Sequence, residues 1–153
     1  MFEAVHTERT SAEPAAIWAL WADPGRWSDW NEQVERVDLD GGELRLGAAA
    51  RVKLKRGGTV KYEVIAIEVE RLLIEEARFP GARVGHEHRL TPATRGCEIA
   101  HRLYVEGPLS GFWSLMLGRK RMRESVARFT ERERQLTEPR GKPKPKRGAG
   151  SRR

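Results

Sequence analysis

Apolar and polar residues alternate along most of the first 105 residues, with the two-residue period of strands that bury one face. Gly-Gly and Pro-Gly pairs and one Pro-Ala-Thr-Arg segment interrupt the alternation and are typical of turns. The pattern predicts strands over residues 2–10, 34–40, 51–55, 59–70, 71–79, 83–91 and 96–105. Consecutive strands joined by such short turns favour a single antiparallel sheet.

Helical spacing replaces this alternation in two parts of the chain. It predicts a helix over residues 14–22, which an Asp-Pro-Gly segment ends, and a short helix or turn that carries Trp27 and Trp30. A long helix is expected from Pro108 to about residue 135. One sheet closed by one long helix leaves a hollow between them, which is a common form of small-molecule site.

The first third of the long helix is apolar on nearly all sides, so it is expected to meet something other than water. Packing within the domain, or against a second copy in a homodimer, is the commoner reason for such a pattern. A cavity wall is the other explanation. The candidates for that wall are Leu109, Phe112, Trp113 and Met116.

The positive charge of the chain is concentrated at its C-terminal end. The formal net charge is +7, and residues 138–153 hold seven basic residues and one acid, a net +6, which leaves +1 for residues 1–137. We predict one folded domain over residues 1–137 and a disordered basic tail rich in Pro, Lys and Arg over residues 138–153. No specific nucleic-acid partner is expected, although the tail offers a weak contact for anionic surfaces.

Several classes of protein are not expected from this sequence. Cys97 is the single cysteine, so no intramolecular disulfide forms, and the first residues do not resemble a signal peptide. The apolar runs are too short to span a membrane, so we expect a cytoplasmic protein. Phosphate-loop and dinucleotide-binding motifs are absent, and we expect neither a cofactor nor a bound metal.

Three histidines are the best candidates for polar groups in the hollow. If the last two strands pair around residues 92–95, His86 faces His101 and His88 faces Ile99, all on the more apolar side of the sheet. A structural role, in which the imidazoles hydrogen-bond one another, is the commonest for such residues. Ligand recognition or proton transfer is a second role, and metal binding a third.

Glu75 and Tyr62 are further candidates, and each has two interpretations. Glu75 faces water if Leu72 and Ile74 face inward, which we favour. In the opposite register it joins the inner face and can orient a ligand hydroxyl or act as a base with a raised pKa. The Tyr62 ring packs in the core or forms part of the cavity wall with a polar tip. With His86 and His101, Glu75 completes the candidate catalytic set.

The order of elements and several short motifs resemble the SRPBCC superfamily, which includes START-related, birch-pollen-allergen-like and polyketide cyclase/dehydrase-like proteins. The motifs are Pro14-Ala-Ala-Ile-Trp18, Asp23-Pro-Gly-Arg-Trp27-Ser-Asp-Trp30-Asn31, His88-Arg-Leu-Thr-Pro92, Gly96-Cys-Glu-Ile-Ala-His101 and Gly107-Pro-Leu109. The resemblance implies an α+β helix-grip fold, with a curved antiparallel sheet of about six to seven strands around a long C-terminal helix. Two short helices follow the first strand in this fold.

The resemblance also implies a capacity to bind an apolar or amphiphilic small molecule, either lipid- or polyketide-like. We expect the ligand between the sheet and the C-terminal helix, near Tyr62, His86, His88 and His101. A polyketide cyclase or dehydratase that uses histidine or Glu75 for proton transfer is the enzymatic alternative. An accessory protein that engages a partner through the apolar helix or the basic tail is the third hypothesis.

Overall fold

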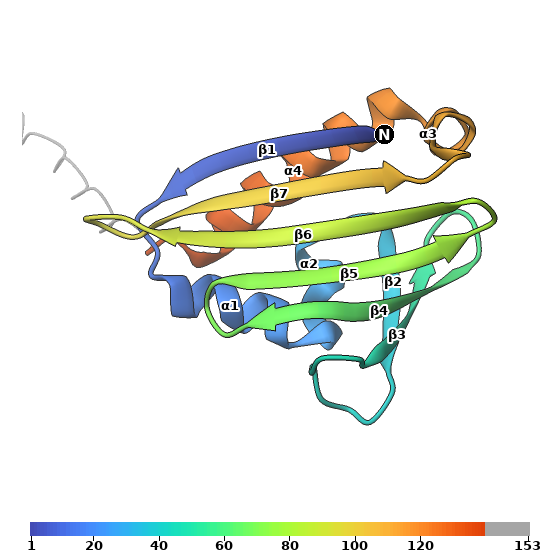
Figure 1. Cartoon of the computed structure of the whole chain (residues 1–153). Coiled ribbons are helices and arrows are strands. Elements are labelled where there is room, and N and C mark those ends of the chain that lie inside the picture. The colour runs from blue at the N-terminus through green and yellow to red at the C-terminus, as the bar shows by residue number, and fades with distance from the viewer. Residues whose placement is uncertain (140–153) are drawn as a thin grey trace, which may run out of the picture.

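The computed structural model describes residues 1–139 of the 153-residue chain. At its centre lies a seven-stranded sheet in the order β1-β7-β6-β5-β4-β3-β2, with every neighbouring pair antiparallel (Figure 1). The strands are β1 (Phe2–Thr10), β2 (Val34–Leu39), β3 (Ala49–Leu54), β4 (Thr59–Glu68), β5 (Leu72–Phe79), β6 (Ala82–Pro92) and β7 (Cys97–Glu106). The helices are α1 (Pro14–Ala22), the 3-10 turn η1 (Pro24–Arg26), α2 (Trp27–Trp30), α3 (Ser110–Leu117) and α4 (Arg119–Thr137).

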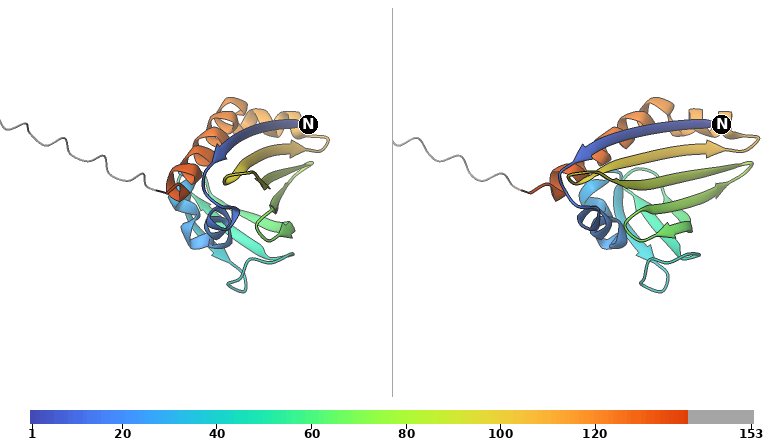
Figure 2. Two further views of the ribbon diagram at one scale, coloured as in Figure 1. Left: turned by 90° about the vertical axis from the view of Figure 1, so that its left-hand side faces the viewer. Right: turned by 60° about the vertical axis from the view of Figure 1, so that its left-hand side comes forward.

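The sheet is strongly curved, and α1, α2 and α4 lie on its inner side (Figure 2). The long helix α4 packs against β1 and β7 and also contacts α1 and α2. This arrangement confirms the predicted α+β helix-grip fold. Within residues 1–139, the long helix covers the inner face of the sheet and leaves the outer face uncovered. The core forms on the inner face.

The segment between α1 and β2 is held by indole side chains. Asp23 Oδ1 accepts a hydrogen bond from the Gly25 amide at 3.1 Å, which ends α1 and starts the next turn. Trp27 Nε1 donates to the Trp21 carbonyl at 2.9 Å. Trp21, Trp27 and Trp30 are buried, so the tryptophan-rich segment seals one end of the sheet rather than forming an exposed platform.

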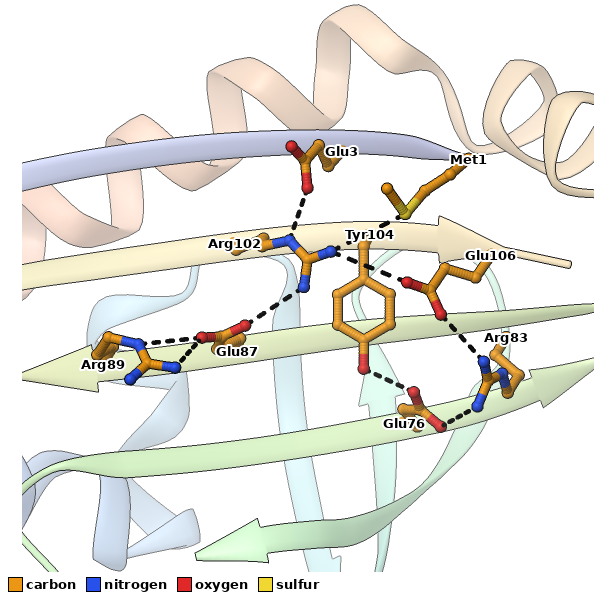
Figure 3. Close-up of polar contacts among 9 residues, drawn as sticks. All are labelled: Met1, Glu3, Glu76, Arg83, Glu87, Arg89, Arg102, Tyr104 and Glu106. Carbon is orange, nitrogen blue, oxygen red and sulfur yellow. Dashed lines mark hydrogen bonds and ion pairs between the residues drawn. The ribbon is translucent and has the colours of Figure 1, made fainter. Parts of the chain in front are cut away.

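The outer face of the sheet carries a lattice of charged side chains (Figure 3). Arg102 Nε lies 2.7 Å from Glu3 on β1, and Arg102 Nη1 lies 3.3 Å from Glu87 on β6. Tyr104 on β7 donates its hydroxyl to Glu76 on β5 at 2.6 Å. These contacts connect four neighbouring strands on the face of the sheet that meets water. The hydrophobic core therefore forms on the inner face.

The predicted single helix after Pro108 is two helices. Gly118 has φ +84°, in the left-handed region that glycine adopts without strain, and it separates α3 from α4. In α4 the residues Met122, Val126 and Phe129 are buried on one face, as their spacing predicts. The break turns α3 away from the continuation of that face, and this changes which residues reach the core.

The predicted tail begins at the last described residues. Glu138 follows α4 and its amide donates to the Arg134 carbonyl at 3.0 Å. Residues 140–153 lie outside the described residues, so the predictions of disorder and of anionic contacts in the tail stay predictions. None of the helices in residues 1–139 combines the length and apolar character that a membrane crossing requires.

Candidate functional site

The three histidines lie together on the inner face, although their predicted pairing was wrong by two residues. His88 faces His101, and His86 faces Leu103 rather than His101. The reason is that β6 continues to Pro92, which pairs with Cys97, so the four-residue turn spans residues 93–96 instead of 92–95. A shift of two residues keeps every side chain on the same face, and all three imidazoles are buried as a result.

Glu75 also lies on the inner face, which corrects the favoured prediction that it faces water. It pairs with His86 across β5 and β6 and is buried, as are Leu73 and Ala77 on the same side. The sequence was misleading because β5 is apolar on both faces. Leu72 and Ile74 occupy the outer face and are half-buried there.

A chain of hydrogen bonds joins these groups to the helices. Trp21 Nε1 on α1 donates to Glu133 Oε1 on α4 at 2.8 Å, and Glu133 Oε2 lies 2.7 Å from His101 Nε2. His101 Nδ1 in turn lies 2.8 Å from His86 Nε2. When His101 donates through Nε2 to Glu133 Oε2, its Nδ1 accepts from His86 Nε2. The remaining nitrogen of His86, Nδ1, is then an acceptor and lies 3.8 Å from Glu75.

Burial sets the protonation states of these groups. It raises the pKa of the Glu75 carboxyl to about 8, although His101 opposes the rise. Burial, and then the neighbouring imidazoles His88 and His101, hold the pKa of His86 well below its ordinary value. The pKa of His88 is lowered well below the ordinary value by burial and by His101. At neutral pH Glu75 therefore keeps its proton while His86 and His88 are uncharged.

Glu75 and His86 form part of the wall of a cavity of about 170 Å³ between the sheet, α2 and α4. Most of the wall is apolar, with Trp30, Phe79 and Phe129 among the lining residues. The exposed Arg121 also borders the cavity, so the cavity reaches the surface at the start of α4. An engineered apolar cavity of about 150 Å³ admits a benzene molecule, which sets the scale of a possible guest.

The structure brings only some of the predicted residues to this cavity. Tyr62, Glu75 and His86 line it, and burial, with Glu75 nearby, raises the pKa of the Tyr62 phenol to about 12. His88 and His101 are not among the lining residues. They support His86 and Glu75, because His88 Nε2 lies 3.2 Å from Glu75 Oε1 and the His88 ring stacks on that of His86 at 3.7 Å.

The predicted apolar wall from the helix after Pro108 is not at the cavity. Leu109, Phe112 and Met116 are 48, 54 and 67% exposed and none of them lines it. Trp113 is half-buried outside the cavity, packs on Phe79 and donates its indole N–H to the Pro80 carbonyl at 2.8 Å. The physical reason is the break at Gly118, after which α4 supplies most of the helical part of the cavity wall and α3 only Leu117.

Sequence analysis missed several residues of the site, and the helical spacing of α4 could have found most of them. Met122 and Phe129 line the cavity from this helix, and Glu133 follows on the same buried face. A carboxylate at a buried helical position signals a buried partner. Gln33 carries no comparable signal, because it lies in the loop between α2 and β2.

The three histidines also offer nitrogen atoms within 4.8 Å of one another, close enough for one metal ion to reach all three. Hydrogen bonds engage both nitrogens of His101 in this arrangement, and His88 Nε2 contacts Glu75. A neutral hydrogen-bonded cluster therefore accounts for the contacts of His101 and for the His88 contact with Glu75 without an ion. One ring nitrogen of His88, Nδ1, has no hydrogen-bond partner in residues 1–139.

The curved sheet, the long helix and the buried polar cluster beside a cavity define a helix-grip protein of the SRPBCC type. Residues 1–138 match the model of a family described as polyketide cyclase / dehydrase and lipid transport. The chain belongs to this family. Among curated proteins, no sequence matches it.

Solved structures confirm the fold at low sequence identity. A protein from Mesorhizobium loti is 18% identical with a TM-score of 0.65, over 88% of this chain and 96% of that one. A hypothetical protein from Helicobacter pylori is 11% identical with a TM-score of 0.72, over 89% and 88%. Norcoclaurine synthase from Thalictrum flavum, in complex with dopamine and hydroxybenzaldehyde, is 15% identical with a TM-score of 0.64, over 88% and 85%.

Proposed function

We propose that the protein binds a small, largely apolar molecule in the cavity and holds its polar group against Glu75 and His86. The observation that carries this proposal is a buried carboxyl in a largely apolar wall. Burying a carboxyl is costly unless its polar atoms are paired. Glu75 Oε2 has no hydrogen-bond partner within residues 1–139, so it is ready to pair with a guest.

Cavity size and unpaired groups define the class of guest. A volume of about 170 Å³ suits one aromatic ring or a short chain, and it is smaller than the roughly 300–1,000 Å³ of drug-sized sites. Trp30 also lines the cavity, and its Nε1 has no partner among the described residues. A phenol, an aromatic aldehyde or a short amphiphile matches one unpaired acceptor and one unpaired donor. The rest of a longer molecule would extend past Arg121.

The family supports this proposal without deciding between binding and catalysis. Its description includes both polyketide cyclases or dehydrases and lipid transport. In the norcoclaurine synthase complex, a protein with a similar fold is bound to dopamine and hydroxybenzaldehyde, which are single-ring molecules. That protein is too distant to transfer its activity, so the guest class rests on the cavity itself.

Proton transfer is the second candidate function, and one observation favours it. Glu75 is protonated near neutral pH, with a pKa of about 8, and His86 Nδ1 is an acceptor 3.8 Å away. Cyclisation and dehydration both need a proton donor and a proton acceptor at the reacting atoms. The hydrogen bonds from Glu133 through His101 hold the His86 ring in place, which supports such a role.

Thermal melts with matched guests test the binding proposal. We expect para-cresol to raise the melting temperature by several degrees at concentrations well above its dissociation constant, and toluene to raise it less. Leu103→Phe fills the cavity and should remove the effect, because Leu103 lines it. Leu46→Phe is the control, since Leu46 is 66% exposed and lies outside the cavity.

Native mass spectrometry of the purified protein completes the test. A bound small molecule that is recovered unchanged supports binding, and one that the protein converts supports proton transfer. Two results together would contradict the proposal. One is the absence of a bound molecule, and the other is that cresol and toluene shift the melting temperatures of Leu103→Phe and Leu46→Phe equally.

A further inference from the structure

The helix α3 buries its two serines and exposes most of its large apolar residues, while Trp113 and Leu117 pack against the core. Ser110 and Ser114 are buried against the body, and Ser114 is fully buried. The opposite side exposes four large apolar residues, Leu109 at its N-cap and then Phe112, Leu115 and Met116, which we call the α3 apolar face. At about 100° per residue these four positions fall within about 120° of the helix circumference. A surface helix ordinarily turns such residues toward the core.

The α3 apolar face is an unusual concentration for a protein surface. Ten large apolar side chains are exposed in residues 1–139, and four of them belong to this face. Leu115 and Met116 are 68 and 67% exposed, so neither packs on the protein. Scattered apolar side chains need no explanation, but a contiguous group of this kind marks a contact surface.

Positive charge adjoins this face. Arg119, Lys120, Arg121 and Arg123 follow α3 directly, all are exposed, and residues 107–123 contain no acidic residue. Lys120 lies 3.7 Å from Glu124, but no carboxylate of residues 1–139 forms an ion pair with Arg119, Arg121 or Arg123. Arg119 and Arg123 lie over the Phe2 ring, 5.5 and 5.2 Å from its centroid. We name these four basic residues the α4 basic turn.

We propose that the α3 apolar face and the α4 basic turn together dock on an anionic lipid surface. Apolar side chains enter the boundary between headgroups and acyl chains, while arginine and lysine extend to the phosphate groups. A second copy of the chain fits this surface poorly. A two-fold interface would bring the same patch of both copies together, with both basic turns and no acidic residue of 107–123 in it, and like charges within an interface oppose association.

Docking through this surface has a consequence for the cavity. Leu117, at the end of α3, and Arg121 and Met122 in α4 border the cavity. A docked protein would therefore hold the cavity opening against the lipid, and an apolar guest would pass between the two without crossing water. This last step rests on the proposed function, whereas docking itself does not depend on what the cavity holds.

Vesicle sedimentation with the full chain tests the proposal. We expect binding to phosphatidylcholine vesicles that contain about 30% phosphatidylglycerol and little binding to phosphatidylcholine alone. The double variant Leu115→Ser/Met116→Ser should bind about tenfold less or weaker still. Leu46→Ser/Val69→Ser is the matched control, because these residues are 66 and 70% exposed on other parts of the surface. The control should bind like the wild type.

A charge variant tests the second half of the surface. Arg121→Glu/Arg123→Glu should also weaken binding, with the larger loss at about 0.1 M salt than at about 0.5 M. Three results would overturn the proposal. The first is no binding of wild type to anionic vesicles, and the second is full binding by the Leu115→Ser/Met116→Ser variant, which would assign the contact to residues 138–153. The third is a wild-type dimer that does not bind vesicles and that Leu115→Ser/Met116→Ser converts to a monomer.

Discussion

At the scale of single residues, the site is a balance between burial and proton affinity. Glu75, His86 and His88 are all buried, and burial favours the uncharged form of each. A carboxyl that keeps its proton near neutral pH destabilises the fold relative to an uncharged isostere as the pH rises. Such a cost at the wall of a cavity is typical of functional groups.

The pH dependence of unfolding should reveal Glu75. Its pKa is about 8 in the folded protein and 4.5 in the reference state, so the unfolded chain loses the proton first as pH rises. The free energy of unfolding should fall between about pH 4.5 and pH 8 by up to a few kcal/mol through this group, and be constant above. Glu75→Gln removes the effect. We therefore expect the free energy of unfolding of the variant, relative to that of the wild type, to increase as the pH rises across this window.

Urea melts of wild type and Glu75→Gln at several pH values provide the measurement. His86 and His88 are present in both proteins, so their contribution largely cancels in the difference. Parallel curves from pH 5 to pH 8 would show that the Glu75 carboxyl is not proton-bound in the folded state.

At the scale of elements, close approach of strands depends on glycine as much as on apolar pattern. Gly85 on β6 faces Tyr104 on β7, and the Tyr104 ring crosses it to reach Glu76 on β5 (Figure 3). A Cβ added at Gly85 would overlap the phenol ring. The absence of a side chain at this position is therefore what lets one tyrosine join three strands.

Gly85→Ala should destabilise the protein by about 1–3 kcal/mol, because the Tyr104 ring must move and its hydroxyl loses Glu76. The measurement is chemical denaturation. Gly111→Ala is a matched control, since a Cβ there has no neighbour within 4 Å and lies in a helix. In a Tyr104→Ala background the Gly85→Ala change should cost little, and an equal cost in both backgrounds would rule out the steric explanation.

The strands and helices were largely predictable from the sequence, whereas the β6–β7 register and the break between α3 and α4 were not. Alternation located the strands, and the face of the three histidines followed from it. The register failed at the β6–β7 turn, where strand pairing extends through Pro92 in a way that alternation alone does not reveal. The break at Gly118 was missed, because a lone glycine within helical spacing is often tolerated. Glu75 was misplaced because β5 is apolar on both faces.

At the scale of the whole molecule, the buried side chains of the described residues and the family match end close together. The last fully buried side chain of the described chain is Glu133, and Glu138 lies after the final helical turn. The family match also ends at residue 138. The predicted division between residues 137 and 138 can therefore be tested by removing residues that follow it.

Removal of residues 140–153 should leave the melting temperature within about 1 °C of the full chain, because the family match and the fully buried side chains of residues 1–139 both end before residue 140. Differential scanning calorimetry on both proteins makes the comparison. A lower melting temperature for the shortened chain would mean that the last residues stabilise the domain, against the predicted division at residue 138.

The indoles at the inner face give the molecule a built-in optical reporter. Trp21 donates to Glu133 and its ring lies 5.1 Å from that of His88, and the Trp30 ring lies 5.9 Å from it at a right angle. Emission from these two rings depends on the polarity and charge of their immediate surroundings. Occupation of the cavity, or a change of charge on the imidazoles, should therefore alter the intrinsic fluorescence, so that guests can be screened without any label.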